Sequence, residues 1–377
     1  MSQVYDGPDS LAEIGPILER EAPRSLLILR DSRSYGACGA AQKIDPQLSG
    51  RSVAIVDIAV KIPTVEDIGS VIAQIRRVSS DFIIAVGGGT VLDIAKAASV
   101  LQATEGDLRA AIRDGEALSG SAIPKILVPT TAGTGAESTP FAVVYIAGKK
   151  HSLYDSRLPG EYIILAPELT HSLNGRITAE TGCDALAQAV EGYWSIRATP
   201  ESKTFSAEAL TLILKNLPPA VRSPDPPNRR AMLLGAHLAG KSIAVARTTV
   251  AHSLSYPLTA RFGIAHGHAV MLTLPYFFPL LDRADADAIS KGANLATVRR
   301  NFSELLAILG VRSGDEAMEK LLALMDSLGL ERRLSAFGIG SGDIETILQS
   351  GFTPDRVENH PCKIGYREVE AILRHIL

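Results

Sequence analysis

The segment TTVAHSLSYPLTARFGIAHGH, residues 248–268, places His252, His266 and His268 around an otherwise apolar stretch. Imidazole is the commonest side-chain ligand for divalent transition metals in proteins. His252 and His266 each begin an apolar run, which predicts that both are buried, whereas His268 lies two residues from His266 and would point elsewhere on a helix. The segment therefore indicates a candidate metal site built on His252 and His266.

A carboxylate that could join such a site lies upstream, in TGCDALAQAVEGYW at residues 181–194. Asp184 and Gln188 are four residues apart and so share one face of the expected helix. Spacing alone favours Asp184 as an acid near the N-terminus of that helix, where the helix dipole stabilises it, and Glu191 as an exposed carboxylate. Spacing does not show whether this helix and the histidines converge.

A second kind of chemistry is indicated by DFIIAVGGGTVLDIAKAA, residues 81–98, which predicts a strand, a glycine turn and a helix start. Glycine has no Cβ, so the backbone can approach a phosphate closely, and the N–H groups of the helix start can donate to it. Three glycines also make an ordinary tight turn, and the usual GxGxxG fingerprint is absent.

The segment KILVPTTAGTGAES, residues 125–138, favours the phosphate interpretation because it ends another strand in small hydroxyl residues and glycines. Loops at the ends of parallel strands face one crevice, the usual ligand position in an open α/β sheet. Asp31 ends the strand LLILRDS, where a carboxylate would bind an adenosine ribose and repel a 2′-phosphate, so NAD(H) is favoured over NADP(H). An ordinary turn aspartate is the alternative. The candidate cofactor residues are Asp31, Gly87, Gly88, Gly89, Asp93, Thr130, Thr131 and Thr134.

The elements that must position these residues differ between the two halves of the chain. The first half alternates short apolar runs with helical patterns, which predicts an α/β dinucleotide-binding domain with a parallel sheet over residues 1–175. After that point apolar residues recur at three-to-four spacing, so residues 176–377 are predicted to form an all-α domain. The join lies near Asn174 and Gly175, which interrupt the pattern.

Composition excludes several classes of function. The formal net charge of −3 provides no basic field for nucleic acid or anionic membranes, and no run of uncharged apolar residues is long enough to span a bilayer. The N-terminus lacks a signal-peptide pattern, and three widely spaced cysteines suit a reducing compartment. We expect a cytoplasmic protein with a small-molecule ligand.

Four motifs in this order resemble the iron-containing (group III) alcohol dehydrogenase family: GGGTVLDIAK, PTTAGTGAES, the Asp-Ala-Leu of GCDALAQAVE, and HSLSYPL followed by AHGHA. The resemblance covers practically the whole chain. It implies a dehydroquinate synthase-like architecture, with a divalent metal and the nicotinamide in the cleft between the two domains, and a homodimer or higher assembly. It also implies that Asp184, His252 and His266 bind the metal, which would be Fe(II) or Zn(II).

This sequence departs from the family pattern at two positions. The fourth metal ligand of the family is a histidine four residues after the aspartate, and Gln188 stands there instead. A histidine four residues after the second metal ligand, linked to proton transfer in the family, is replaced by Tyr256. We therefore predict weaker metal binding, with Gln188 as a weak fourth ligand. His252 and Tyr256 are the candidate catalytic residues, and a metal-linked water is an alternative proton donor.

Within the family, EGYWSIRATPES, RTTVAHSLSYPLT and AHGHA look most like phosphonoacetaldehyde reductases, which form 2-hydroxyethylphosphonate. A phosphonate dianion requires cationic and hydrogen-bonding partners, because burying it without them is costly. The candidate substrate residues are Arg247, Thr248 and Thr249. An equally good interpretation is that Arg247 is a surface residue and that the two threonines pack in a helix. The alternatives are another iron-type alcohol dehydrogenase, a maleylacetate reductase-like enzyme that orients an anionic substrate without metal, and a catalytically silent nucleotide-binding protein.

Overall fold

The computed structural model describes residues 2–114, 118 and 120–377. The chain divides into two compact units, Met1–Leu173 with Asp225–His237, and Asn174–Pro224 with Leu238–Leu377. The predicted domains were residues 1–175 and 176–377. The observed units differ from them because the segment 225–237 belongs with the first unit. Within that unit Arg230 pairs with Asp6 at 2.9 Å, and Arg229 donates to the carbonyl oxygen of Leu173 at 2.8 Å.

The first unit is built on a six-stranded sheet in which every pair of neighbours is parallel, in the order β1-β8-β5-β4-β2-β3. The predicted α/β fold with a parallel sheet is thereby confirmed. The strands are β1 (Gln3–Asp6), β2 (Leu26–Asp31), β3 (Val53–Ile58), β4 (Phe82–Gly87), β5 (Lys125–Pro129) and β8 (Tyr162–Leu165). An antiparallel hairpin follows β5, formed by β6 (Phe141–Ile146) and β7 (Lys149–Tyr154).

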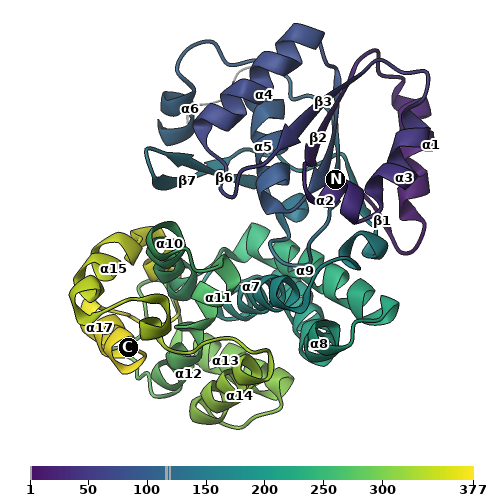
Figure 1. Cartoon of the computed structure of the whole chain (residues 1–377). Coiled ribbons are helices and arrows are strands. Elements are labelled where there is room, and N and C mark those ends of the chain that lie inside the picture. Colours follow the sequence, from purple (N-terminus) through teal and green to yellow (C-terminus); the bar gives the residue numbers. More distant parts are fainter. Residues whose placement is uncertain (1, 115–117, 119) are drawn as a thin grey trace. The chain divides into compact units, whose positions relative to one another are not determined.

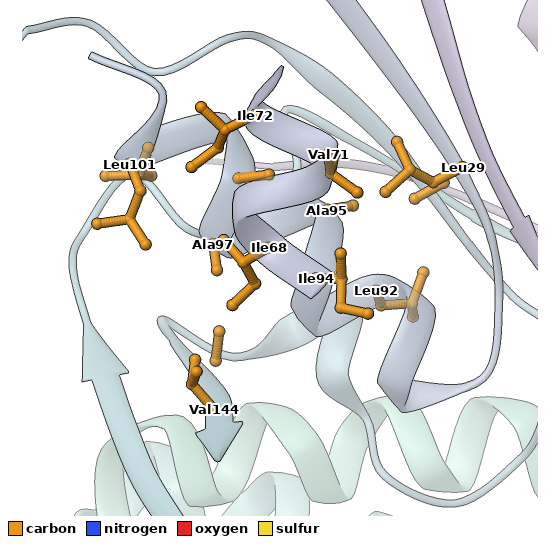
Figure 2. Close-up of a cluster of buried hydrophobic side chains, with 14 of the residues drawn as sticks. Leu29, Ile68, Val71, Ile72, Leu92, Ile94, Ala95, Ala97, Leu101 and Val144 are labelled. Atoms are coloured by element: carbon orange, nitrogen blue, oxygen red, sulfur yellow. The ribbon is translucent and has the colours of Figure 1, made fainter. Parts of the chain in front are cut away.

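Alternate residues of the central strands pack against helices on opposite faces of the sheet, as a strand period of two requires. Leu27 and Leu29 belong to one apolar cluster with α4 and α5, whereas Leu26 and Ile28 belong to a second cluster with α1 and α3. Figure 2 shows side chains of the first cluster, contributed by α4, α5 and the strands. The helices of this unit are α1 (Ile14–Glu21), α2 (Ser34–Ala37), α3 (Ala40–Ile44), α4 (Val65–Val78), α5 (Gly89–Leu101) and α6 (Leu108–Asp114).

The second unit is helical, as predicted (Figure 1), and the second half of its helix α7 is buried. The Asn174 side chain accepts a hydrogen bond from the Ile177 N–H at 2.9 Å and so caps the start of α7. Across the described part of the chain, no helix is both long and apolar enough to cross a membrane. The remaining helices are α7 (Gly175–Trp194), α8 (Pro200–Arg222), α9 (Pro226–Ala246), α10 (Val250–Phe262), α11 (His266–Met271), α12 (Leu274–Asp282), α13 (Leu295–Leu309), α14 (Gly314–Ser327), α15 (Ile344–Gly351), α16 (Pro354–Glu358) and α17 (Tyr366–His375).

Candidate functional site

The glycine and threonine loops lie at the same edge of the sheet of the first unit. Strands β2, β4 and β5 are neighbours, and Gly87 at the end of β4 is in register with Pro129 at the end of β5. The Thr130 N–H donates to the Gly87 carbonyl oxygen at 3.0 Å, which ties the two loops together. The carboxyl edge of the sheet therefore carries both loops, as the strand pattern predicted.

The two loops are in van der Waals contact, and glycine is required at one contact point. A Cβ on Gly89 would lie 2.8 Å from the Thr134 side chain, closer than real Cβ contacts. A Cβ on Gly88 would lie 3.5 Å from Thr131, an ordinary contact. The threonine loop thus packs against the start of α5, and the N-terminus of a helix favours an anion.

The remaining two candidate cofactor residues take part in contacts within the fold. Asp93 is buried and accepts hydrogen bonds from Lys96 Nζ at 3.3 Å and from the Val143 N–H at 3.1 Å. Asp31 Oδ1 accepts from the Arg33 and Ser34 N–H groups at 3.0 and 2.6 Å, so it caps the turn after β2. Asp93 accordingly anchors α5 to β6. Asp31 has the role of a turn aspartate, and it lies at the same carboxyl edge of the sheet as the two loops.

Lys96 is a structural residue that the sequence analysis did not single out. Its ammonium group is fully buried and donates to Asp93, to the Ala136 carbonyl oxygen at 2.7 Å and to Thr139 Oγ1 at 3.0 Å. Burial lowers the pKa of Lys96, against the opposing charge of Asp93. The lysine thus fastens the segment after the threonine loop to α5. Its spacing of three residues from Asp93 in LDIAK was the available signal.

Asp184, His252 and His266 form a compact cluster inside the second unit. One ligand atom from each lies within 4.8 Å of the others. Asp184 Oδ1 is 3.3 Å from His252 Nε2 and 3.9 Å from His266 Nε2. Asp184 and His252 are buried, whereas the His266 side chain is 32% exposed. One carboxylate and two imidazoles that converge with one open side fit a divalent transition metal.

Helix α7 places Asp184 at the cluster from its middle rather than from its first turn. Asp184 is the tenth residue of Gly175–Trp194 and is 3% exposed, so the interpretation of it as a helix N-terminal acid was wrong. The helix is nearly covered on all sides over its second half, and a buried carboxylate in such a place needs a cationic partner. The two histidines and the metal that they could hold meet that need.

Gly267 allows α11 to approach α7 closely enough for His266 to reach the cluster. A Cβ at this position would lie 2.0 Å from the Glu180 carbonyl oxygen and 2.6 Å from the Asp184 backbone nitrogen. These are backbone atoms in the middle of a helix, so they cannot move aside without disturbing Asp184. In the motif AHGHA, a glycine therefore follows His266 because any side chain at that position would collide with the backbone of α7.

Glu191 supports the cluster from behind and was wrongly interpreted as exposed. It is fully buried, and its Oε2 accepts a hydrogen bond from His252 Nδ1. Its Oε1 accepts from Thr249 Oγ1 at 2.6 Å and from the Ala251 N–H at 3.1 Å. A carboxylate on the far nitrogen of a ligating histidine orients the ring and raises its basicity. The spacing of seven residues from Asp184, two helical turns, was the signal that could have found it.

The charges of the cluster stabilise one another. Burial lowers the pKa of His252, but Glu191 and Asp184 raise it overall, to about 9. Burial raises the pKa of Asp184, but the charge of His266 and a hydrogen bond with His252 lower it overall. The carboxylates of Asp184 and Glu191 therefore stabilise positive charge at this place, which is the electrostatic environment that a bound cation requires.

Two further predicted residues border the cluster. Gln188 lies one turn after Asp184 and hydrogen-bonds with its carboxylate, which contributes to the lowered pKa of Asp184. The ring of Tyr256 stacks on that of His266, with centroids 6.2 Å apart and planes 15° apart. Both positions at which this chain departs from the family pattern therefore lie in direct contact with proposed metal ligands.

The candidate substrate residues lie in the link between α9 and α10. Arg247 has φ of 63°, a left-handed conformation that arginine rarely adopts. Asn359 holds this link, since its Nδ2 donates to the carbonyl oxygens of Ala246 and Thr248 at 2.9 and 3.0 Å. Thr248 and Thr249 are buried, and Thr249 donates its hydroxyl proton to Glu191, so Thr249 belongs to the support of His252.

Comparisons with known proteins agree with this architecture over the whole chain. The profile "Iron-containing alcohol dehydrogenase" matches residues 2–167, and "Fe-containing alcohol dehydrogenase family, C-terminal" matches residues 178–377. Phosphonoacetaldehyde reductase of Streptomyces viridochromogenes is 39% identical over 258 residues, which are 66% of this chain and 65% of that protein. This match therefore spans slightly less than two thirds of that relative.

Two further relatives match over nearly their full lengths. Long-chain-alcohol dehydrogenase 1 of Geobacillus thermodenitrificans is 30% identical over 97% of this chain and 93% of that protein. The crystal structure of sulfoacetaldehyde reductase from Bifidobacterium kashiwanohense in complex with NAD+ has a TM-score of 0.88 at 27% identity, covering 100% of this chain and 96% of that one. With its motifs, its fold and its carboxylate–histidine cluster in agreement, the chain belongs to the iron-containing alcohol dehydrogenase family of oxidoreductases.

Proposed function

We propose that this protein reduces phosphonoacetaldehyde to 2-hydroxyethylphosphonate with NADH, in a site where Asp184, His252 and His266 hold a divalent metal. The convergence of these three ligand atoms within 4.8 Å carries the proposal. When bound, the metal would polarise the aldehyde carbonyl and stabilise the negative charge that develops on its oxygen. Fe(II) and Zn(II) both suit two imidazoles and one carboxylate.

The chain's own residues have distinct roles in this proposal. Glu191 keeps the Nδ1 proton of His252 in place, so that Nε2 faces Asp184. Gln188 supports Asp184 through its hydrogen bond and is the proposed weak fourth ligand of the metal. Tyr256, whose ring stacks on that of His266, is the proposed proton donor to the alcohol oxygen.

For the coenzyme, we propose NAD(H), with its phosphates on the loops of Gly87–Gly89 and Thr130–Thr134. The contact between Gly89 and Thr134 supports a shared backbone surface for an anion. Arg30, the cation beside Asp31, donates to Asp57 at 2.7 Å and lies over the Tyr35 ring. That engagement removes one cation that could have bound a 2′-phosphate, which favours NAD(H) over NADP(H).

For the substrate, the names of two relatives point to the same chemistry. Phosphonoacetaldehyde and sulfoacetaldehyde both carry an anionic group one methylene away from the aldehyde carbon. Arg247 is a candidate partner of the anionic group because it carries a permanent positive charge on a link that leads directly into the helix of His252. Its left-handed backbone conformation is of the kind that clusters at functional sites.

The proposed function is tested by metal analysis of the purified protein together with NADH oxidation. We expect bound Fe or Zn, and NADH oxidation with phosphonoacetaldehyde that exceeds that with propionaldehyde and maleylacetate. His266→Ala removes a ligand that is on the open side of the cluster, so it should abolish both bound metal and aldehyde reduction. Unchanged metal content in His266→Ala would contradict the ligand assignment, and no aldehyde reduction with Fe(II) or Zn(II) added would contradict the enzyme assignment.

A second candidate function is a metal-independent reductase of the maleylacetate type. Gln188 favours it, because an amide at the position of the family's fourth ligand weakens metal binding. This candidate predicts that a chelator leaves NADH oxidation with maleylacetate unchanged. The phosphonoacetaldehyde proposal predicts that the same chelator abolishes activity, and that added metal restores it.

A further inference from the structure

Arg356 is a largely buried arginine beside the candidate site that neither the motifs nor the family resemblance singled out. It lies on the short helix α16, which packs against α10, the helix of His252 and Tyr256. Its side chain is 12% exposed. A guanidinium group in such a place has lost most of its hydration and requires partners that replace it.

The position of Arg356 relative to the cluster follows from two contacts. Its guanidinium forms a hydrogen bond with Tyr256. The ring of Tyr256 in turn stacks on that of His266. One aromatic side chain therefore separates the arginine from a proposed metal ligand, and its positive charge lies within the electrostatic range of Glu191 behind the cluster.

Among the residues that the structure describes, Arg356 has fewer hydrogen-bond partners than a guanidinium has N–H groups to donate. The nearby carboxylate is that of Asp355, whose Oδ2 is 3.9 Å from Nη1, too far for a hydrogen bond. The Asp355 side chain is 58% exposed, so water screens its charge. Burial lowers the pKa of Arg356, but Tyr256 and Asp355 raise it overall, so the group stays charged. A guanidinium has five N–H donors in a planar fork, which suits a doubly charged oxyanion.

We propose that Arg356 binds the anionic group of the aldehyde substrate, and so makes the site selective for short aldehydes that carry a phosphonate, or a sulfonate, next to the reacting carbon. The inference rests on the proposed function, because it assumes that the aldehyde carbonyl is bound at the cluster of Asp184, His252 and His266. With one methylene between the carbonyl carbon and phosphorus, the anion must be bound within a side chain's reach of those ligands. Arg356, one aromatic ring away, meets that requirement.

The test compares an anionic and a neutral aldehyde in matched variants. For Arg356→Gln, we expect kcat/KM for phosphonoacetaldehyde to fall about 10- to 100-fold, the equivalent of losing charged hydrogen bonds, and that for propionaldehyde to change less than about threefold. Arg356→Lys should recover part of the loss, because it retains the charge but not the planar fork. Arg367→Gln, an exposed arginine of α17, is the control and should behave as the wild type.

Binding of an inert anion gives a second readout that does not depend on the variant's turnover. Ethylphosphonate lacks the aldehyde, and it should inhibit propionaldehyde reduction by the wild-type holoenzyme competitively. Its inhibition constant should rise about 10- to 100-fold in Arg356→Gln. If Arg356→Gln fails to fold, Arg356→Lys and the wild-type inhibition decide: absence of ethylphosphonate inhibition in the wild type overturns the inference.

The outcomes separate this inference from the proposed function. If the wild type reduces no aldehyde, the proposed function fails. If the wild type is active and Arg356→Gln loses both aldehydes equally, or shifts the pH profile of both, then Arg356 acts on Tyr256 or on folding, and the anion role is overturned. If Arg247→Gln, made in parallel, loses selectivity while Arg356→Gln retains it, the role belongs to Arg247 instead.

Discussion

The loops at the carboxyl edge of the sheet and the cluster on α7, α10 and α11 use different parts of the residues that form them. The loops offer backbone N–H groups, and their key residue, Gly89, contributes by having no side chain. The cluster offers side-chain atoms of Asp184, His252 and His266. A site formed by backbone groups therefore depends on the absence of a side chain at one position. A site formed by side chains depends on residue identity and on the packing that brings distant residues together.

Gly267 stands in the side-chain site, yet it acts as Gly89 does, by permitting close approach of two segments. The difference lies in what a Cβ would meet. At Gly89 it would meet the branched side chain of Thr134 on a surface loop, whereas at Gly267 it would meet the backbone of a buried helix.

The largest effect is therefore expected from Gly267→Ala. The new methyl group would collide with the Glu180 carbonyl oxygen and the Asp184 nitrogen, so α11 must shift and carry His266 away from Asp184. We expect loss of bound metal and a fall of about 1000-fold or more in kcat/KM, comparable to removing a catalytic group. Metal analysis and steady-state kinetics measure both. Full metal occupancy in this variant would show that α7 and α11 have room that the structure does not indicate.

A smaller effect is expected from Glu191→Gln. The amide retains the shape but removes the charge that orients and polarises His252, so metal affinity should fall about 10- to 100-fold. Competition with a chelator measures the affinity without reference to turnover. Glu208→Gln, an exposed carboxylate on α8, is the matched control. Equal metal affinities in the wild type and in Glu191→Gln would show that Glu191 contributes only to packing.

The smallest effect is expected at the backbone site, from Gly89→Ala compared with Gly88→Ala. The first places a methyl group 2.8 Å from Thr134, so the threonine loop must shift, and KM for NADH should rise about tenfold. The second meets Thr131 at 3.5 Å and has an ordinary φ of −77°, so KM should change little. The ratio of the two KM values, rather than either alone, tests whether the loop contact matters for the coenzyme. Equal KM values in the two variants would separate that contact from NADH binding.

The sequence predicted the parts of the fold whose signals are contiguous. Runs such as FIIAVG and KILVP are fully buried strands, and their apolar composition alone identified them. Strands β1 and β8 were missed because each is only four residues long, and pairing in the sheet stabilises them more than their own pattern does. The β6–β7 hairpin was missed for a related reason, since its second strand is largely polar.

For the candidate site, residue type and spacing determined a strand–glycine–helix loop, a hydroxyl-rich second loop and a metal-binding set of Asp184, His252 and His266 by family resemblance. The tertiary structure alone decided that Glu191 is buried behind His252, that Asp184 lies in the middle of its helix, and that Arg356 reaches Tyr256. The physical reason is the range of each interaction. Backbone geometry and amphipathic periodicity act over a few residues, whereas burial of a charge depends on helices that are joined only by packing.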